Sequence, residues 1–335
     1  MENALKFKAL VVEKTADKQF VRAIRERDVN DLPPGDLVVR VHYSSLNYKD
    51  ALSATGHPGV TRQFPHTPGI DAAGEVVSCL SGAFAPGEKV IITGYDLGME
   101  TDGGWGQLIR IPSEWALRLP EGLSLCDSMA LGTAGLTAGL SALKLVQAGV
   151  RPDQGDVLVT GATGGVGSIA VSILAGAGYR VVASTGKEAD TEYLKGLGAA
   201  EVISRDTVTA GAEKAVLAER WGGVVDVVGG TTLVAALKST KYGGTVTCCG
   251  LVGSPELPLN VYPFILRGVS LIGIDSVQCP GAVRGEVWKR LASAWKPARL
   301  AEVVTECTLQ NIEPMIEAIL KGGVTGRVVV NMLEC

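Results

Sequence analysis

The pattern of hydrophobic and polar positions divides the chain into two parts. Up to about residue 125, short apolar runs that fit β-strands are separated by glycine and proline clusters such as Pro33-Pro34-Gly35. We expect strands at residues 9–12, 36–43, 74–79, 88–93 and 107–111, and one helix near residues 48–54. The uneven spacing of the turns favours an irregular β-barrel over a regular meander.

From residue 126 onward, strand and helix signals alternate. The expected strands are residues 156–160, 180–184, 201–203, 224–228, 244–249 and 269–274, with helices near 168–176, 188–197, 231–239 and 261–266. Several of these strands are continuous apolar runs, which is typical of strands covered by helices on both faces. The fold class is therefore α/β, with a doubly wound parallel sheet in this part.

These patterns predict the domain boundaries. We expect a β-rich domain over residues 1–127 and an α/β domain over residues 128–299. A helical pattern at 309–321 and a strand at 327–332 follow a linker near residue 296, and we expect residues 300–335 to return to the first domain. Residues 128–143 carry no charge but fall short of the about 20 residues that span a bilayer, so they predict a buried helix.

Composition and charge indicate which kind of molecule the protein binds. The chain has 335 residues, with 31 basic and 35 acidic side chains spread along it, and no basic tract that would hold a nucleic acid or an anionic membrane. The first ten residues lack the apolar core of a signal peptide, so a cytoplasmic protein is expected. A small molecule is the expected partner.

Cysteine and histidine usage argues against a metal site. The seven cysteines show no CxxC spacing, and none of the three histidines has a second nitrogen or sulfur ligand at helical or loop spacing. The cysteines also form no disulfide framework, because their number is odd and their spacing scattered. We expect free thiols and no bound metal.

A glycine-rich segment, residues 161–167 (GATGGVG), stands between the first strand and the first helix of the α/β part. It is a variant of the GxGxxG fingerprint in which Ala162 replaces the first glycine. Such a turn lets a pyrophosphate approach the amides at the helix N-terminus, here those of Thr163, Gly164, Gly165 and Val166. The segment predicts a dinucleotide site; the alternative is a plain tight turn.

The residues after the second strand indicate which dinucleotide binds. NAD-selective sites usually carry a carboxylate there for the ribose 2′-hydroxyl, but this chain reads Ser184-Thr185-Gly186-Lys187. Small hydroxyls with a lysine suit a 2′-phosphate, and Arg205 at the end of the third strand could add a second cation. NADPH is the predicted cofactor. The alternative is that Lys187 and Arg205 are solvated surface charges.

Six segments together resemble a known group of proteins. They are SSLNYKDAL (44–52), FPHTPGIDAAGEV (64–76), GTAGLTA (132–138), TGATGGVGS (160–168), YLKGLGA (193–199) and PFILRGVSLIGIDSV (263–277). In these segments the chain resembles the medium-chain dehydrogenase/reductase superfamily, in its zinc-free quinone-oxidoreductase-like part, and looks most like the NADPH-dependent acrylyl-CoA reductase branch. The resemblance implies a GroES-like catalytic domain and a Rossmann cofactor domain, with the active site in the cleft between them.

One departure from the alcohol dehydrogenases of this superfamily indicates the chemistry. Those enzymes carry Gly-His-Glu where this chain has Gly69-Ile70-Asp71, so the imidazole that would bind a catalytic zinc is missing. Without that Lewis acid, the expected reaction is hydride transfer to an already activated double bond. The resemblance to the acrylyl-CoA reductase branch alone implies the substrate, acrylyl-CoA, and the product, propionyl-CoA. A quinone reductase, a reductase of free enones or enals, and a non-catalytic NADPH-binding protein are the alternatives, in that order.

The resemblance also implies roles for single residues. Tyr48 would lie at the nicotinamide and the substrate, with Asn47 and Asp50 fixing the wall of the site. The structural alternatives are that Tyr48 is a core residue, that Asn47 caps the helix and that Asp50 is an acid of its first turn. His57 is a further candidate acid, and an ordinary loop histidine is the alternative.

Three more residues would hold the nicotinamide side of the cofactor, namely Leu251, Ile265 and Ser276, although Leu251 and Ile265 could equally serve in packing. The loop 94–106 is either a lid or an ordinary loop. Candidate cations for the phosphates of coenzyme A are Arg62, Arg284, Lys289 and Arg290. We also expect a homodimer, because residues 269–274 form an apolar strand that would lie at a sheet edge.

Overall fold

The computed structural model describes residues 5–334, which form two compact units. Unit 1 runs up to Thr133 and also includes Val277–Gly285 and the chain from Leu300 onward, while unit 2 comprises Ala134–Ser276 and Glu286–Arg299. The first boundary falls after residue 133, whereas the sequence predicts it after residue 127. Residues 277–285 belong to unit 1, whereas the sequence predicts them in the second domain. The reason is that two helices, α2 (Leu125–Gln147) and α8 (Gly281–Leu291), each continue across a boundary.

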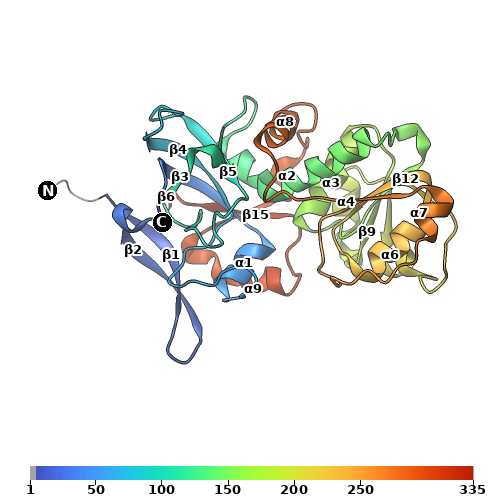
Figure 1. Cartoon of the computed structure of the whole chain (residues 1–335), viewed down its shortest axis with the longest axis horizontal. Helices are drawn as coiled ribbons and strands as arrows, with labels where there is room; N and C mark the ends of the chain where they lie inside the picture. The colour runs from blue at the N-terminus through green and yellow to red at the C-terminus, as the bar shows by residue number, and fades with distance from the viewer. Residues whose placement is uncertain (1–4, 335) are drawn as a thin grey trace. The chain divides into compact units, whose positions relative to one another are not determined.

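Unit 1 is built on one seven-stranded sheet (Figure 1). Its path runs β14-β15-β3-β4-β5-β7, and β6 also pairs with β3. The bounds are β3 Leu37–Leu46, β4 Asp71–Cys79, β5 Lys89–Thr93, β6 Leu108–Ile111, β7 Ala116–Arg118, β14 Val304–Thr308 and β15 Arg327–Asn331. Register shifts between β3 and β4 make the sheet irregular, as the turn pattern predicts.

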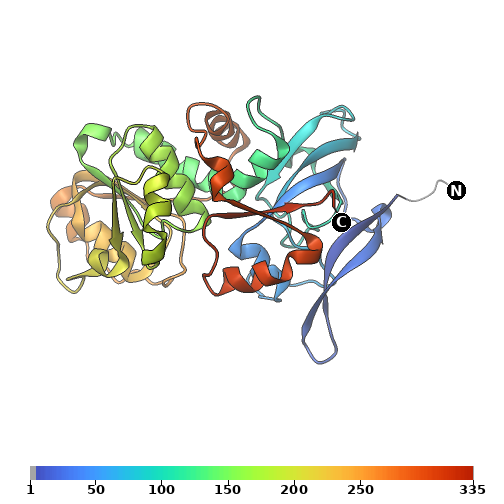
Figure 2. The same ribbon diagram turned by 180° about the vertical axis from the view of Figure 1, so that it is seen from behind.

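The last part of the chain completes this sheet. β15 pairs antiparallel with β3, with Val328 opposite Leu46, and parallel with β14. Figure 2 shows β15 and α9 (Glu313–Leu320) among the N-terminal elements, and α9 packs against α1 (Tyr48–Ala54). The predicted helix at residues 48–54 and the predicted return of residues 300–335 to the first part of the chain are both observed.

Unit 2 has a parallel six-stranded sheet in the order β10-β9-β8-β11-β12-β13. Its strands are β8 Asp156–Val159, β9 Val181–Thr185, β10 Glu201–Ser204, β11 Trp221–Asp226, β12 Thr240–Cys248 and β13 Ser270–Gly273. The helices, on both faces of the sheet in Figure 1, are α3 Gly165–Gly176, α4 Thr191–Gly196, α5 Arg205–Thr209, α6 Gly230–Ser239 and α7 Tyr262–Arg267. All six predicted strands are present, and the order reverses between β8 and β11, which is where doubly wound sheets bind ligands.

The sequence analysis does not predict two of the longer elements, a strand of nine residues and a helix of 11 residues. Strand β2 (Phe20–Asp28) forms a separate hairpin with β1 (Lys6–Lys14), and its charged, largely solvated sequence hides the strand pattern. Helix α8 contains two glycines, which lower helix propensity. It nonetheless buries Arg284, Val287, Trp288 and Leu291 at helical spacing.

Helix α2 is longer than the uncharged stretch that predicts it. With 23 residues it is long and apolar enough to cross a membrane by length and composition, so the length argument against a span is wrong. However, 83% of its most apolar window is buried within the protein, and its backbone is interrupted at Gly132. Burial of this kind is typical of a core helix, as the sequence predicts.

The loop 94–106 is packed into unit 1 over its second half. Trp105 is fully buried and its indole donates to the Ser45 carbonyl oxygen at 3.2 Å. The amides of Gly103 and Gly104 donate to the carbonyl oxygens of Thr67 and Gly69 at 2.7 and 2.8 Å. Because these contacts fix its backbone, this half is an ordinary packed loop and not a lid.

Candidate active site and cofactor site

The glycine-rich segment forms a tight turn between β8 and α3. Gly161 has a φ of 57°, which favours glycine, and a Cβ on Gly167 would lie only 2.3 Å from the Gly161 carbonyl oxygen. The first turn of α3 therefore begins directly against the turn. A bare backbone at the N-terminus of a 12-residue helix fits the pyrophosphate of a dinucleotide, so the residues present suit the predicted cofactor.

The residues predicted to select the cofactor lie together at the ends of neighbouring strands. The hydroxyls of Thr163 and Thr185 are 3.3 Å apart, and the Lys187 amide donates to the Thr185 hydroxyl at 2.9 Å. The guanidinium of Arg205 lies over Gly186, since a Cβ there would be 3.0 Å from Arg205 Nη2. Ser184 is buried in β9.

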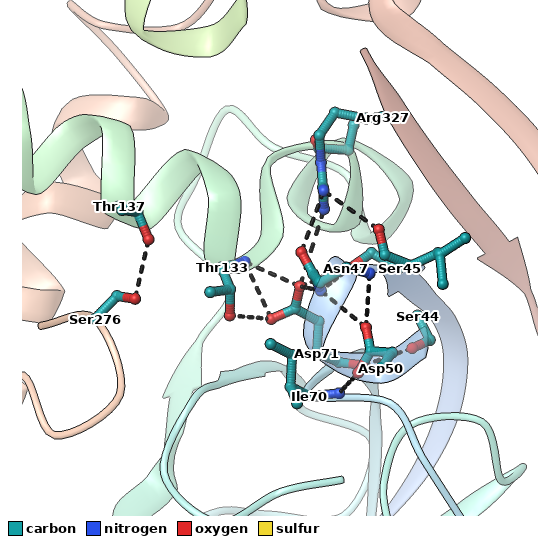
Figure 3. Close-up of polar contacts among 12 residues, drawn as sticks. Ser44, Ser45, Asn47, Asp50, Ile70, Asp71, Thr133, Thr137, Ser276 and Arg327 are labelled. Carbon is teal, nitrogen blue, oxygen red and sulfur yellow. Dashed lines mark hydrogen bonds and ion pairs between the residues drawn. The ribbon is translucent and has the colours of Figure 1, made fainter. Parts of the chain in front are cut away.

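The residues predicted for the nicotinamide side are less tightly grouped. A groove of about 570 Å³ lies at the carboxyl ends of β11, β12 and β13, and its lining includes Leu251 but neither Ile265 nor Ser276. Leu251 and Ile265 are 66% and 68% exposed, so neither side chain packs in the core of the single chain. Ser276 is buried and its hydroxyl accepts from the Thr137 hydroxyl at 2.9 Å (Figure 3).

In unit 1, Asn47 and Tyr48 stand at the start of α1. Asn47 is the N-cap residue, and Tyr48 is the first helical residue. The Tyr48 side chain is 44% exposed, and its hydroxyl has no hydrogen-bond partner among residues 5–334. The core-tyrosine alternative is therefore wrong, and the hydroxyl is accessible to a ligand. His57 lies just beyond α1, where its Nδ1 accepts from the Gly59 amide at 3.1 Å.

Two carboxylates are fully buried beneath this helix end. Asp50 accepts from the Ile70 amide at 2.7 Å and from the backbone and side-chain nitrogens of Asn47 at 2.7 and 3.1 Å. Figure 3 shows it next to Asp71, which accepts from the Asn47 amide group at 2.8 Å. Asn47 therefore links both carboxylates. It occupies the N-cap position and its backbone amide donates to the first-turn acid Asp50, but among the described residues its side chain makes no cap hydrogen bond.

Burial and charge determine the electrostatics of this cluster. Loss of hydration, with the neighbouring Asp71 carboxylate as a second cause, raises the pKa of Asp50 to about 7. Arg327 on β15 is also fully buried, which lowers its pKa, although both carboxylates oppose that shift. Its Nη2 is 4.0 Å from Asp71 Oδ2 and has no hydrogen-bond partner within the described part of the chain.

Sequence reasoning missed three members of this cluster as site residues: Asp71, Thr133 and Arg327. Each of the three stands in an unusual sequence context that could have marked it as a candidate. Asp71 is an acid in an apolar segment, Thr133 follows a glycine inside a helix, and Arg327 precedes three valines. Their meeting depends on packing between β4, α2 and β15, which local pattern does not reveal.

The cations suggested for coenzyme A are only partly suitable. Arg284 is buried, donates to Thr93 and Val277, and lies over the Tyr95 ring, so this assignment is wrong. Arg290 pairs with Glu286 at 2.8 Å, while Arg62 and Lys289 are exposed. No group of three histidine, cysteine, aspartate or glutamate side chains that could hold a metal occurs within residues 5–334.

Comparison with known proteins identifies the family. Residues 33–121 match the alcohol dehydrogenase GroES-like domain, and residues 165–293 match the zinc-binding dehydrogenase family. YhfP of Bacillus subtilis (strain 168), which carries the provisional name of a quinone oxidoreductase, is 48% identical over 97% of this chain and 99% of its own. The chain belongs to the medium-chain dehydrogenase/reductase superfamily.

Within that superfamily, relatives with different names are similar to the chain. Acrylyl-CoA reductase AcuI of Ruegeria pomeroyi is 42% identical over 97% of this chain and 99% of its own. A crystal structure of the YhdH oxidoreductase from Salmonella enterica in complex with NADP has a TM-score of 0.94 and 42% identity, covering 97% of this chain and 99% of that one. YhfP with NAD bound has a TM-score of 0.95 and 47% identity, covering 98% and 100%.

Proposed function

We propose that the chain is an NADPH-dependent oxidoreductase that reduces the C=C bond of acrylyl-CoA to give propionyl-CoA. The observation that carries this proposal is the similarity to acrylyl-CoA reductase AcuI over almost the full length of both chains. The exposed Tyr48 hydroxyl above a buried polar cluster supports a site for a polar, activated alkene in unit 1. The name of YhfP favours a quinone reductase as the second candidate.

The choice of NADPH is supported by this chain's own residues. Arg205, Gly186 and the hydroxyl of Thr185 form a site for a 2′-phosphate, and β9 ends without the carboxylate that binds a ribose 2′-hydroxyl. The relatives include one structure with NADP and another with NAD, so relatives alone leave the preference undecided.

In this proposal the nicotinamide of bound NADPH supplies a hydride, which is added to the β-carbon of the thioester, while a proton is added to the α-carbon. The chain's residues bind and orient the reactants. The Tyr48 hydroxyl either donates a hydrogen bond to the substrate or transfers its proton to it. Asn47, at the start of α1, holds the backbone of Tyr48 in place. The negative charge that develops on the thioester oxygen requires fixed hydrogen-bond donors.

The reaction is proposed to need no metal, because residues 69–71 lack the histidine of the zinc-dependent relatives. Prolonged chelation is expected to leave turnover unchanged. Stoichiometric zinc in the purified enzyme, lost together with activity, would contradict this part of the proposal.

The deciding experiment measures NADPH oxidation with acrylyl-CoA, a benzoquinone and a simple enone in parallel. We expect the highest kcat/KM with acrylyl-CoA, and propionyl-CoA as its product. A higher kcat/KM with the quinone would move the assignment to the second candidate. Tight NADPH binding without turnover of any of the three would identify a non-catalytic NADPH-binding protein.

A further inference from the structure

The Asp71 carboxylate receives hydrogen bonds from three separate elements of unit 1 (Figure 3). The Ser45 hydroxyl at the end of β3 donates at 2.6 Å, and the Asn47 amide group at the start of α1 donates at 2.8 Å. Thr133 in α2 donates its hydroxyl at 2.6 Å and its backbone amide at 2.9 and 3.0 Å. A single buried side chain thus connects β3, α1 and α2.

The backbone is shaped to let this carboxylate approach. Gly132 interrupts α2 with a φ of 53°, and a Cβ there would lie 2.5 Å from Asp71 Oδ2. On the other side, a Cβ on Gly104 would lie 2.1 Å from the Asp71 carbonyl oxygen. A larger residue at position 132 would displace the Asp71 carboxylate, and one at position 104 would displace its backbone carbonyl group.

The contacts of Asp71 lead directly to Tyr48. Asn47 precedes Tyr48 in the chain, and its side chain donates to both buried carboxylates. Asp50, held by the same asparagine, also closes the first turn of α1. A change at Asp71 therefore alters the position of the first residue of α1 while leaving the Tyr48 side chain itself intact.

We propose that Asp71 is a positioning residue for the reduction, acting through Asn47 to hold the Tyr48 hydroxyl at the substrate. This inference rests on the proposed function of Tyr48. Asp71 does not touch the reacting atoms; it fixes the end of α1 against β3 and α2. Its negative charge also opposes ionisation of Asp50, so the two carboxylates act as one electrostatic unit with Arg327.

The test compares Asp71→Ala, Asp71→Asn and the control Asp102→Ala in the full-length protein. Asp102 is a largely buried carboxylate of the same unit that binds Arg27 and the Thr67 amide. We expect Asp71→Ala to lower kcat about 10- to 100-fold with an unchanged Kd for NADPH, because misplacement of a reacting group has effects of that size. Asp102→Ala should lower the melting temperature and leave kcat within about twofold of the parent.

The conservative variant separates positioning from folding. In Asp71→Asn, the remaining oxygen can still accept from Ser45 and Asn47, with the amide nitrogen turned toward the Thr133 hydroxyl, so kcat should recover in part. Loss of the Asp71 charge should also lower the pKa of Asp50, so that a pH dependence of kcat set by Asp50 would move to lower pH. A kcat and pH profile equal to those of the parent in Asp71→Asn would overturn the proposal, even if Asp71→Ala fails to fold.

A readout without substrate keeps this test independent of the proposed reaction. Amide hydrogen exchange over residues 47–54 should quicken in Asp71→Ala and stay unchanged in Asp102→Ala. If the parent protein does not reduce acrylyl-CoA, the proposed substrate is wrong, and kcat is measured with the acceptor that is turned over. Parent-like exchange and parent-like kcat in Asp71→Ala would together reject the role of Asp71.

Discussion

Among single residues, Tyr48 combines an accessible hydroxyl with a firmly held backbone. The side chain reaches solvent, yet its residue begins a helix whose cap is fixed by two buried carboxylates. A hydroxyl in this setting can meet a ligand without first breaking an internal hydrogen bond. Its removal therefore tests chemistry more than folding.

We expect Tyr48→Phe to lower kcat by at least about tenfold and to raise KM by less, if the hydroxyl acts chiefly in the transition state. The melting temperature should stay the same, because the hydroxyl makes no contact within residues 5–334 that folding would lose. Tyr242→Phe, at another exposed tyrosine, is the matched control. Unaltered kinetics in Tyr48→Phe would remove this residue from the mechanism.

The expected preference for NADPH over NADH depends on the side chains of Lys187 and Arg205. NADPH should bind at least about tenfold more tightly than NADH, because cations around a dianionic phosphate contribute about 1.4 kcal/mol or more. Lys187→Ala and Arg205→Ala should each reduce this ratio, as measured from Kd values by fluorescence titration. Lys241→Ala serves as the control, since Lys241 lies near the amino-terminal end of β12 and contacts the Gln154 carbonyl oxygen just before β8, away from the carboxyl ends of the strands. Equal affinities in the parent protein would show that this pocket is wrongly assigned.

Among the elements, those with a strong repeating pattern could be predicted from sequence. Strands β8, β9 and β11 of unit 2 are almost entirely buried, and helix α1 is predicted with its observed bounds. Strand β2 could not be recognised, since none of its residues is fully buried in the two-stranded hairpin and no alternating apolar pattern results. The hydrogen bonds to Asp71 could not be predicted either, because the donors Ser45, Asn47 and Thr133 come from β3, the start of α1 and α2, which are brought together only by the fold.

Helix α1 gives the protein a pH-dependent stability through Asp50. The pKa of Asp50 is raised to about 7 in the folded protein, so the folded state holds this proton more tightly than the unfolded chain does. Its contribution to the free energy of unfolding is fully present below about pH 4 and is lost as pH rises to about 7, with an upper limit of about 4 kcal/mol. Three N–H donors to the carboxylate lower the pKa of Asp50, but burial and the Asp71 charge outweigh them.

Denaturant unfolding at pH 5 and pH 8 measures this effect. The difference between the two free energies should be smaller in Asp50→Asn than in the parent protein. Asp36→Asn provides a control that should leave this difference unchanged, because hydrogen bonds from Ser81 and Ser113 lower the pKa of Asp36 to about 2, well below the range from pH 5 to pH 8. Its contribution is present above about pH 4 and is lost as pH falls through about 2. An identical pH dependence in Asp50→Asn and the parent would contradict the raised pKa.

For the whole molecule, the exposed edge of the parallel sheet indicates self-association. Among the strands of residues 5–334, β13 pairs with β12 alone, as the sequence predicts for an edge strand. Exposed apolar side chains lie in the same region of the chain, at Leu251, Val252, Ile265 and Leu266. An open apolar edge of this kind favours pairing with a second copy.

We therefore expect a homodimer joined through the β13 strands of two copies. Light scattering should give twice the chain mass at micromolar concentration. Ile272→Lys, which places a charge on the edge strand, should shift the mass toward the monomer, while Val202→Lys on the opposite edge strand, β10, should not. A monomer mass for the parent protein across this range would refute the expectation.

The place of β15 in the sheet of unit 1 has a consequence for biosynthesis. Arg327 contacts Leu46, 281 residues earlier in the chain, and β15 separates β14 from β3. While the ribosome is making the chain, the residues of β8 to β13 are therefore complete before the first sheet can close. Until β15 is synthesised, the part of β3 that pairs with it in the folded protein lacks that partner strand, although every strand of the unit 2 sheet has already been made.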